Sequence, residues 1–445
     1  MDGMKRLNDE YCELVRENYD ENALCGRRAV EYIAGSTAIY KGKPVPCLYI
    51  PKLFAREARG ALEKAASDIY GILDKVIGRY LRDGAYRRLF PFPKALEELI
   101  LSEAGYPCRL PIARIDIFLN EEDLSFKFCE FNADGSSAMN EDRELNIAIA
   151  DSDAMRRILG RRRLRPMEFF DSWARVFMEI YSSFSGGSGG PRVAIADFLD
   201  SAGAPPTEFV EFRKAFERAG LEAEIADVRS FSYNGGRLAT ADGKPVHAVY
   251  RRAVTRDIMD SLGNVQPFVR AVADGAVCSV GHFRTQVIHN KTIFKILHMP
   301  ETSEFLAEHE RAYVARHVPQ TYVLEKGGSG YADALENKGA WLIKPDDLYA
   351  SRGVYAGADT PQKDWEAALA DCAGKGYLLQ EYVRPYRSAN LDFNENPRPD
   401  FHMYNNITGM FLYGGKLQGF YSRGGPNAVI SGLTGGLTLA SLVEE

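Results

Sequence analysis

The sequence predicts a protein of the mixed α/β (α+β) class, built from several packed units. Three observations support this class. A helical pattern dominates residues 1–105, a strand–helix–strand rhythm occupies residues 192–228, and short strands and helices mix after about Val287. A chain of 445 residues is long enough for two or three units that each bury a core.

The first 185 residues are expected to be mostly helical around one β-hairpin. Helical spacing of apolar residues occurs in "PKLFAREARGALEKAASDIYGILDKVIGRYL", residues 51–81. Two alternating runs around a polar turn make up "LPIARIDIFLNEEDLSFKFCEFNAD", residues 110–134, which predicts the hairpin. The clearest boundary in the chain is the flexible stretch "SSFSGGSGGP", residues 182–191.

A different pattern follows this boundary. Two short apolar strands, "RVAIADF" and "LEAEIADV", flank the amphipathic helix "PTEFVEFRKAFERAG". This βαβ rhythm predicts a small parallel sheet. An Asn-Gly-Gly turn at 234–236 predicts a hairpin, and a later strand ends in Arg251 and Arg252. Further strands are expected in "GAWLIKP", "GVYAG" and "GYLLQEYV", with a last hairpin turning at Gly414 and Gly415.

Composition excludes several classes of function. The net charge of -6 argues against a nucleic-acid partner, and the basic run at 156–165 is expected to be a solvated helix face or linker edge. No apolar stretch approaches the roughly 18 residues of a membrane span, and the start lacks a signal-peptide core. Seven scattered cysteines, never spaced as CxxC, predict a reducing, cytoplasmic setting without a structural metal.

The hairpin brings candidate site residues together. Side chains alternate along a strand, so Arg114 and Asp116 share one face, as do Glu130 and Asn132. A register that pairs Asp116 with Glu130 would gather all four and leave residues 122–124 as a three-residue loop. Two carboxylates and an amide oxygen are ligands of the type Mg²⁺ selects, and an adjacent arginine suits a phosphoryl or carboxylate group. Alone, the stretch fits a solvated hairpin end equally well.

Other fragments fit a nucleotide site. Lys344 ends an apolar strand before a polar, glycine-containing loop, a common way to hold phosphates. Lys291 lies at an expected helix start, and Gln380 and Glu381 end an apolar strand that could border an adenine. Arg423 follows a hairpin strand and precedes "ISGLTGG", whose glycines allow backbone N–H groups to approach an anion. Each fragment by itself also fits an ordinary strand or turn.

Taken together, these residues resemble the ATP-grasp ligases. In the usual order the phosphate lysines come first and the metal-binding Glu-x-Asn comes late, whereas here Glu130 and Asn132 precede Lys344 by more than 200 positions. That order resembles the circularly permuted branch typified by glutathionylspermidine synthase. The similarity spans residues 105–436, and "ARIDIF…CEFNAD" is its most specific part.

The resemblance implies roles for ten residues. Mg²⁺ would be bound by Asp116, Glu130 and Asn132. ATP would be bound by Lys291 and Lys344 at its phosphates and, at adenine and ribose, by Gln380, Glu381 and Val383. Catalytic charge stabilisation would fall to Arg114, facing the phosphoryl group or acyl phosphate, and Arg423.

The same resemblance implies a domain plan. The helical segment and metal-binding hairpin would occupy residues 1–185, and a Rossmann-like pre-ATP-grasp domain residues 191–285. The nucleotide-binding and lid region would span 286–385, with the 346–353 loop as lid, and the chain would return to the ATP-grasp core at 386–445. No GxGxxG is present in the pre-ATP-grasp segment, so dinucleotide binding is not expected there.

The implied function is an ATP-dependent carboxylate–amine ligase. It would form an amide through an acyl phosphate and release ADP and phosphate. The substrates would be small molecules, with peptide, amino acid and polyamine all open, because the loop after Asn132 does not match a glutathione site. The alternatives are a phosphotransferase and a degenerate ATP-grasp scaffold that binds nucleotide without turnover. A homodimer is the default oligomeric state.

Overall fold

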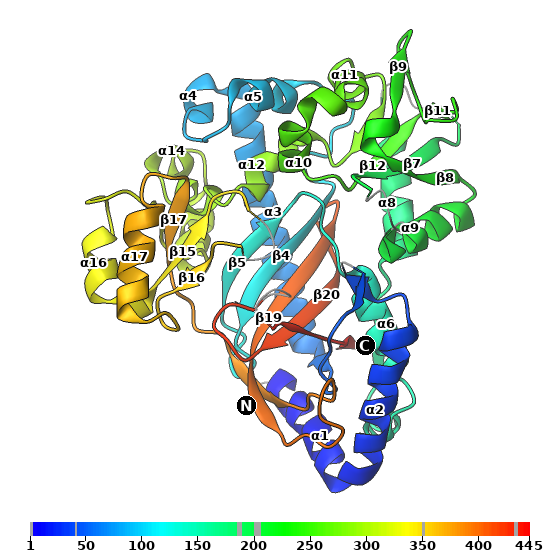
Figure 1. The fold of residues 1–445 in the computed structure, drawn as a ribbon, viewed down its shortest axis with the longest axis vertical. Helices are drawn as coiled ribbons and strands as arrows, with labels where there is room; N and C mark the ends of the chain where they lie inside the picture. Colours follow the sequence, from blue (N-terminus) through cyan, green and yellow to red (C-terminus); the bar gives the residue numbers. More distant parts are fainter. Residues whose placement is uncertain (1–2, 41, 185–188, 200–205, 349–351, 431–434) are drawn as a thin grey trace.

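A six-stranded antiparallel sheet lies at the centre of the computed structural model, which describes residues 3–40, 42–184, 189–199, 206–348, 352–430 and 435–445 (Figure 1). Its strand order is β21-β20-β19-β4-β5, and β18 pairs with β19. The C-terminal strands β19 and β20 therefore lie beside the hairpin from the first third of the chain. The bounds are β4 (Ile112–Leu119), β5 (Phe126–Asn132), β18 (Arg387–Asn390), β19 (His402–Tyr413), β20 (Lys416–Gly425) and β21 (Leu437–Leu439).

Helices from the N-terminal region cover one face of this sheet. The long helix α3 (Arg56–Arg82) lies behind the sheet in Figure 1, and its apolar stripe is buried in one core with sheet residues Ile115 and Phe420. The helical pattern predicted over 51–81 is confirmed from Arg56 onward, whereas Lys52–Phe54 form a strand instead. The other helices of this region are α1 (Gly3–Glu17), α2 (Tyr19–Gly35), α4 (Gly84–Arg87), α5 (Lys94–Leu101), α6 (Met139–Ile149) and α7 (Asp153–Leu159).

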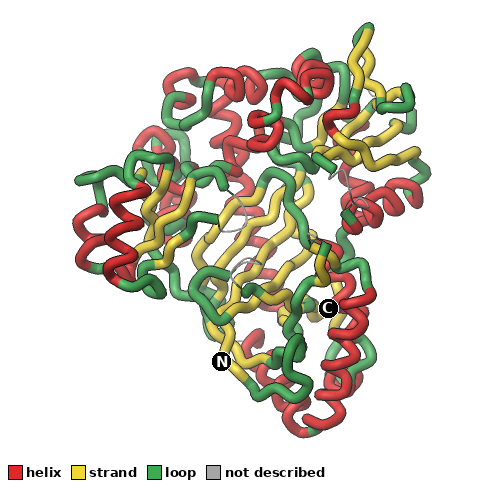
Figure 2. Tube along the Cα trace, viewed as in Figure 1, coloured by secondary structure: helices red, strands yellow, loops and turns green. Residues whose placement is uncertain are grey.

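Two small sheets tie the chain ends to this body. In one of them, β22 (Ser441–Glu444) lies between β3 (Lys52–Phe54) and β6 (Leu164–Pro166), so that the C-terminus packs among N-terminal elements. In the other, β1 (Ile39–Tyr40) pairs with β2 (Lys43–Pro44). Figure 2 shows the largest group of strands in the middle of the molecule, with two smaller groups at the left and the upper right.

The βαβ rhythm after residue 191 forms the expected small parallel sheet, in the order β13-β12-β7-β8. Its neighbours include a three-stranded sheet whose predicted Asn-Gly-Gly hairpin turn is present, with Gly235 and Gly236 at φ 57° and 76°. The strands are β7 (Arg192–Asp197), β8 (Glu222–Asp227), β9 (Ser232–Asn234), β10 (Arg237–Ala239), β11 (Pro245–Val246), β12 (Ala248–Arg251) and β13 (Cys278–Val280). The helices are α8 (Phe170–Ser182), α9 (Thr207–Arg218), α10 (Thr255–Asp260) and α11 (Gln266–Ala273).

The remaining sheet, antiparallel in the order β14-β17-β15-β16, lies across from β5 and is called the β14–β17 sheet below. It contains β14 (Thr321–Val323), β15 (Trp341–Pro345), β16 (Tyr355–Ala356) and β17 (Tyr377–Glu381). Its outer face is covered by α16 (Tyr331–Glu336) and α17 (Gln362–Cys372). The chain reaches it through α12 (Gln286–His289), α13 (Ile293–Ile296), α14 (Pro300–Ser303) and α15 (Glu308–His317).

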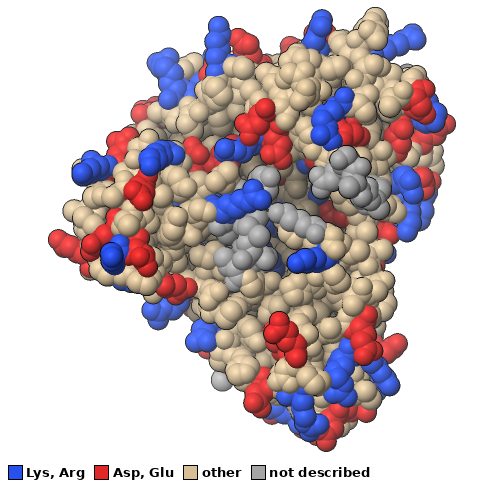
Figure 3. Space-filling view, in the orientation of Figure 1, with Lys and Arg blue, Asp and Glu red and all other residues tan. Residues whose placement is uncertain are grey.

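The surface seen in Figure 3 carries basic and acidic side chains interspersed, without a continuous field of one sign. Within the described ranges, no helix combines the length and the apolar character that a membrane span requires.

Candidate active site

A cavity of about 800 Å³ opens between the central sheet and the β14–β17 sheet. Strands β4, β5 and β20 form one wall, and β15 and β17 contribute to the opposite one. All ten residues singled out from the sequence line this cavity: Arg114, Asp116, Glu130, Asn132, Lys291, Lys344, Gln380, Glu381, Val383 and Arg423. The tertiary structure thus brings together residues from four separate parts of the chain.

The hairpin register is the predicted one at its functional end. Asp116 pairs with Glu130 and Arg114 with Asn132. The predicted three-residue loop at 122–124 is wrong, because the register shifts after Asp116 and Ile117 pairs with Phe128. Cys129 is therefore an extra residue in β5, a β-bulge, and such bulges turn neighbouring side chains to one side. In a regular strand Cys129 would face away from Glu130, yet both residues line the cavity.

Two arginines enclose one carboxylate. Arg114 donates from Nε and Nη2 to the two oxygens of Asp116, at 2.7 and 3.1 Å, and Arg423 donates to Asp116 Oδ2 at 3.0 Å. The Asp116 side chain is only 1% exposed. Its charge outweighs the effect of burial and raises the pKa of Arg114. Both guanidinium groups lie over the ring of Tyr421, 5.4 and 5.5 Å from its centroid.

The close approach of these groups depends on a glycine in β19. Gly409 pairs with Asp116 in the ladder. A Cβ atom at this position would lie 2.8 Å from Arg114 Cδ and 2.9 Å from Asp116 Oδ1. The bare backbone therefore leaves the space in which the arginine–aspartate pair is held.

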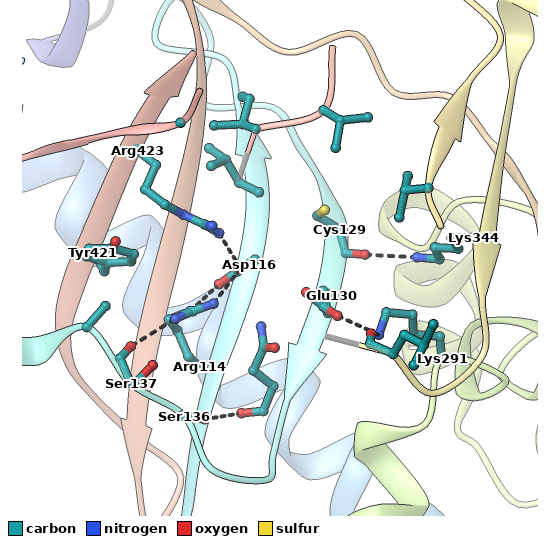
Figure 4. A pocket seen from close by; sticks show the side chains of 18 of the residues that line it. Arg114, Asp116, Cys129, Glu130, Ser136, Ser137, Lys291, Lys344, Tyr421 and Arg423 are labelled. Carbon is teal, nitrogen blue, oxygen red and sulfur yellow. Dashed lines mark hydrogen bonds and ion pairs between the residues drawn. The ribbon is translucent and has the colours of Figure 1, made fainter. Parts of the chain in front are cut away.

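Two lysines approach β5 from the opposite side (Figure 4). Lys291 Nζ lies 2.7 Å from Glu130 Oε1. Burial alone would raise the pKa of Glu130, but the charges of Lys291 and Lys344 outweigh it and lower this pKa to about 2. Lys344 donates to the Cys129 carbonyl at 3.3 Å, and its ammonium lies 4.8 Å from the Phe294 ring centroid. Burial, reinforced by Lys291, lowers the pKa of Lys344 to about 8.

The sequence predicted that Lys291 begins a helix, but it does not begin a regular one. It lies in the turn between the four-residue helices α12 and α13. Its backbone N–H donates to the Asp346 carbonyl and its ammonium to the Leu348 carbonyl, both at 2.8 Å. The proposed lid at 346–353 lies partly outside the described residues, because 349–351 are not described.

The β14–β17 sheet supplies the less polar end of the cavity. Gln380 is buried and donates to Thr321 Oγ1 at 2.8 Å, while Glu381 is partly exposed. Val383 follows the end of β17. The lining here is completed by largely apolar side chains, which suit the faces of a flat aromatic base: Pro319, Leu342, Leu348, Val354 and Tyr382.

The hairpin donors suit a hard cation. Asp116 and Glu130 are directly opposite across the ladder, where Cβ atoms are about 4.5–5.5 Å apart. The buried Nδ2 of Asn132 has no hydrogen-bond partner among the described residues, so this N–H group is left for an acceptor such as a phosphate oxygen, while Oδ1 is the atom that suits a cation. The described residues contain no cluster of three or more His, Cys, Asp and Glu able to hold a metal. Two carboxylates and an amide therefore fit Mg²⁺ that shares its ligands with phosphate and water, rather than a metal held by protein alone.

The segment that follows β5 is held from behind by the parallel-sheet unit. Arg251 and Arg252, at which the predicted strand ends, are both buried. Arg251 Nη1 lies 2.7 Å from Asp134 Oδ1, and Arg252 pairs with Glu208 at 2.9 Å. Arg252 also donates to the Ser136 carbonyl.

Glu208 fixes the start of α6. Its Oε2 accepts from the backbone N–H groups of Ala138, Met139 and Asn140 at 2.9, 2.8 and 3.3 Å. Ala138 has φ 91°, a left-handed conformation that costs free energy for a residue other than glycine. The carboxylate of a distant helix thus stabilises a strained turn in the cavity wall. No sequence signal linked Glu208 to residue 138, because they meet only after two units pack.

Three further polar residues of the cavity escaped the sequence reasoning. Tyr421 donates to Glu141 Oε2 at 2.5 Å, and Thr438 lies 3.2 Å from the same oxygen. All three line the cavity. Tyr421 lies two positions before Arg423 on one strand, so the period-two rule could have placed it on the same face. Nothing local marked Glu141, which lies in the first turn of a helix.

Comparison with known proteins gives a fold but no family. No protein-family model and no curated protein matches the chain. Among solved structures, the chain is similar to a glutathione synthetase-like effector from Globodera pallida in its apo form. That likeness has a TM-score of 0.60 at 12% identity and covers 99% of this chain and 98% of the other. The fold is that of a glutathione synthetase-like protein. A second match is a protein described as a γ-glutamylcysteine synthetase from Methylobacillus flagellatus KT, with a TM-score of 0.40, 10% identity and 89% of each chain covered.

Proposed function

We propose that this protein is an ATP-dependent carboxylate–amine ligase with a circularly permuted ATP-grasp core. In this proposal the parallel sheet is the Rossmann-like pre-ATP-grasp domain. One observation carries the proposal: ten residues chosen from the sequence for phosphate, metal, adenine and acyl-phosphate roles line one cavity. The fold likeness to a glutathione synthetase-like protein supports the same class.

The arrangement suits transfer of a phosphoryl group to a carboxylate. A carboxylate substrate attacks the γ-phosphorus of ATP and becomes an acyl phosphate, which an amine can attack. Lys291 and Lys344 would bind ATP phosphates, and Arg114 and Arg423 would stabilise the charge that develops between phosphate and acid. Mg²⁺ bound by Asp116, Glu130 and Asn132 would supply additional positive charge to the phosphate oxygens.

The ion pairs of the cavity fit this role. Each basic group at the centre now contacts a carboxylate or a carbonyl of β4 or β5: Arg114 and Arg423 contact Asp116, and Lys291 contacts Glu130. If Asp116 and Glu130 held a metal ion, these basic groups would be available to phosphate oxygens. The arrangement therefore suits a cation and a polyphosphate together.

Two rival functions make different predictions. A phosphotransferase would stop at the phosphorylated acid, so free phosphate would not depend on an amine. A degenerate scaffold would bind nucleotide without turnover. We favour the ligase over the scaffold because the charged residues are all present and converge. We also propose a cytoplasmic protein without nucleic-acid or membrane partners. All seven cysteines lie in the described part of the chain and are free thiols, which fits a reducing compartment.

The first test is ATP binding measured by thermal shift, with and without Mg²⁺. We expect a Mg²⁺-dependent rise in melting temperature that Glu130→Ala loses and that the exposed control Glu13→Ala keeps. The second test adds hydroxylamine, ATP and a panel of carboxylic acids, and detects the hydroxamate that an acyl phosphate yields. If the wild type showed neither a thermal shift nor a hydroxamate, the ligase function would be refuted. The nucleotide-binding scaffold would be refuted as well, because it also requires ATP binding.

A further inference from the structure

The residues proposed to bind nucleotide do not account for the whole cavity lining. We call the rest of the lining around the two arginines the acceptor half. It comprises Arg114 and Arg423 together with Lys43, Ser137, Glu141 and Thr438. An amine that attacks an acyl phosphate held by the two arginines would have to approach from this half.

The carboxyl groups of the cavity are not equivalent. Five line it, and four of them have a basic partner. Asp116 and Glu130 are paired as described, Asp134 pairs with Arg251 at 2.7 Å, and Glu381 lies 3.9 Å from Lys127. Glu141 is the exception, since no arginine or lysine among the described residues lies within ion-pair distance of it. Its recorded partners are the hydroxyl groups of Tyr421 and Thr438, so a cationic group of a ligand could pair with it.

Its position places it close to the reacting groups. Tyr421 donates its hydroxyl hydrogen to Glu141 at 2.5 Å, and the ring of the same tyrosine lies under the guanidinium groups of Arg114 and Arg423. A single side chain thus separates Glu141 from the arginine pair. Burial raises the pKa of Glu141 above its usual range, which makes the carboxylate a better proton acceptor.

We propose that Glu141 binds the ammonium group of the amine substrate and accepts its proton before attack on the acyl phosphate. This inference rests on the proposed ligase function. The ammonium loses one proton to Glu141, the nitrogen lone pair forms the C–N bond, and the C–O bond to phosphate breaks with its electrons leaving on phosphate. The second nitrogen proton goes to the departing phosphate, and Glu141 returns its proton to solvent.

The same charges select the class of amine. The acceptor half carries Lys43, Arg114 and Arg423, against Asp116, already enclosed by both arginines, and Glu141. A polyamine would bring several ammonium groups next to these basic side chains with one carboxyl to receive them, and the largely buried Arg114 and Arg423 would repel such groups. An amino acid or a peptide amino terminus brings one ammonium for Glu141 and a carboxylate that suits Lys43. We therefore assign the acceptor to this class and not to the polyamines.

The test compares an uncharged nucleophile with charged ones. Hydroxylamine is uncharged at neutral pH and needs no carboxylate to bind it, whereas glycine, other amino acids and spermidine are cationic at nitrogen. Wild type, Glu141→Gln and the control Glu144→Gln are assayed with ATP, Mg²⁺ and the acid that gives hydroxamate. Glu144 is one turn further along α6, receives hydrogen bonds from Tyr32 and Thr37, and does not line the cavity.

We expect Glu141→Gln to keep hydroxamate formation within about twofold and to lose amide formation with amino acids by roughly 100-fold, the scale of one proton-transfer group. Glu144→Gln should behave as wild type with both nucleophiles. Equal losses with both nucleophiles would overturn the role of Glu141, and spermidine as the best wild-type acceptor would overturn the substrate class. A wild type that forms no hydroxamate with any acid would instead refute the ligase function itself, and this inference with it.

Discussion

Lys291 Nζ lies 2.7 Å from Glu130 Oε1 and 2.8 Å from the Leu348 carbonyl oxygen. One side chain therefore joins β5 of the central sheet to the segment that follows Lys344. Both contacts are of the kind that a phosphate oxygen can replace. A nucleotide that engages Lys291 would thus change the bonding of the hairpin and of residues 346–348 in the same step.

The low pKa of Glu130 predicts a stability change in acid. Its pKa in the fold, about 2, lies below its usual 4.5, because Lys291 and Lys344 outweigh burial. The ionised carboxylate therefore stabilises the fold above about pH 4.5, and this contribution is lost as the pH falls toward 2. The difference in melting temperature between wild type and Glu130→Gln should be largest near neutral pH and shrink in acid. A difference that stays constant down to about pH 3 would contradict the ion pair.

The pKa of Lys344 predicts a pH dependence of ATP binding. Burial lowers this pKa from 10.5 to about 8, so the ammonium that would hold phosphate loses its proton as the pH rises through about 8. The ATP affinity of the wild type, measured by calorimetry, should be constant below that pH. Above it the affinity should fall by up to about tenfold per pH unit, because only the charged form attracts phosphate.

Lys344→Arg is the matched control for this prediction, since arginine keeps its charge throughout this range. Its ATP affinity should be lower than that of the wild type but flat with pH. Wild-type affinity that does not change between about pH 7 and pH 9 would show that Lys344 does not act as a cation toward ATP.

Gly409→Ala tests the arginine–aspartate pair without removing either charge. The new methyl group would lie within 3 Å of Arg114 and Asp116 and would displace both. Overpacking of this kind lowers the free energy of unfolding by about 1–3 kcal/mol. The rate of hydroxamate formation should fall even under conditions in which the variant remains folded. The control Gly71→Ala lies in α3 with no atom near the added Cβ, and should stabilise the fold by about 0.5–1 kcal/mol. Wild-type turnover in Gly409→Ala would contradict the role of this pair.

Glu208→Ala tests how the parallel-sheet unit supports the cavity wall. The change leaves Arg252 buried without its carboxylate and removes the acceptor of three backbone N–H groups. Loss of one partner of a buried pair costs about 3–5 kcal/mol, which urea denaturation can measure. Glu13→Ala breaks a pair with Arg16 in which both side chains are exposed, and should cost less than about 1 kcal/mol. Similar small losses in both variants would mean that Glu208 does not hold α6.

The sequence was informative wherever structure follows from local periodicity. Alternation along β4 and β5 placed Arg114 with Asp116 and Glu130 with Asn132, all on one face of the hairpin, and the ladder pairs them as predicted. The glycine pairs at 235–236 and 414–415 form tight hairpin turns, because such turns need positive φ angles that glycine adopts without strain. These features depend on residues a few positions apart, so one short segment of the chain is enough to predict them.

The tertiary structure alone decided what depends on distant segments. The bulge at Cys129 allows two adjacent residues of β5 to line the cavity, and no residue type in this segment predicts the bulge. Arg423 reaches Asp116 only because β19 and β20 lie beside β4, and Arg252 is buried only because Glu208 arrives from α9. The sequence alone does not show whether a charged side chain contacts solvent, a ligand or a buried partner. The difference is set by what packs against it, which is a property of the whole fold.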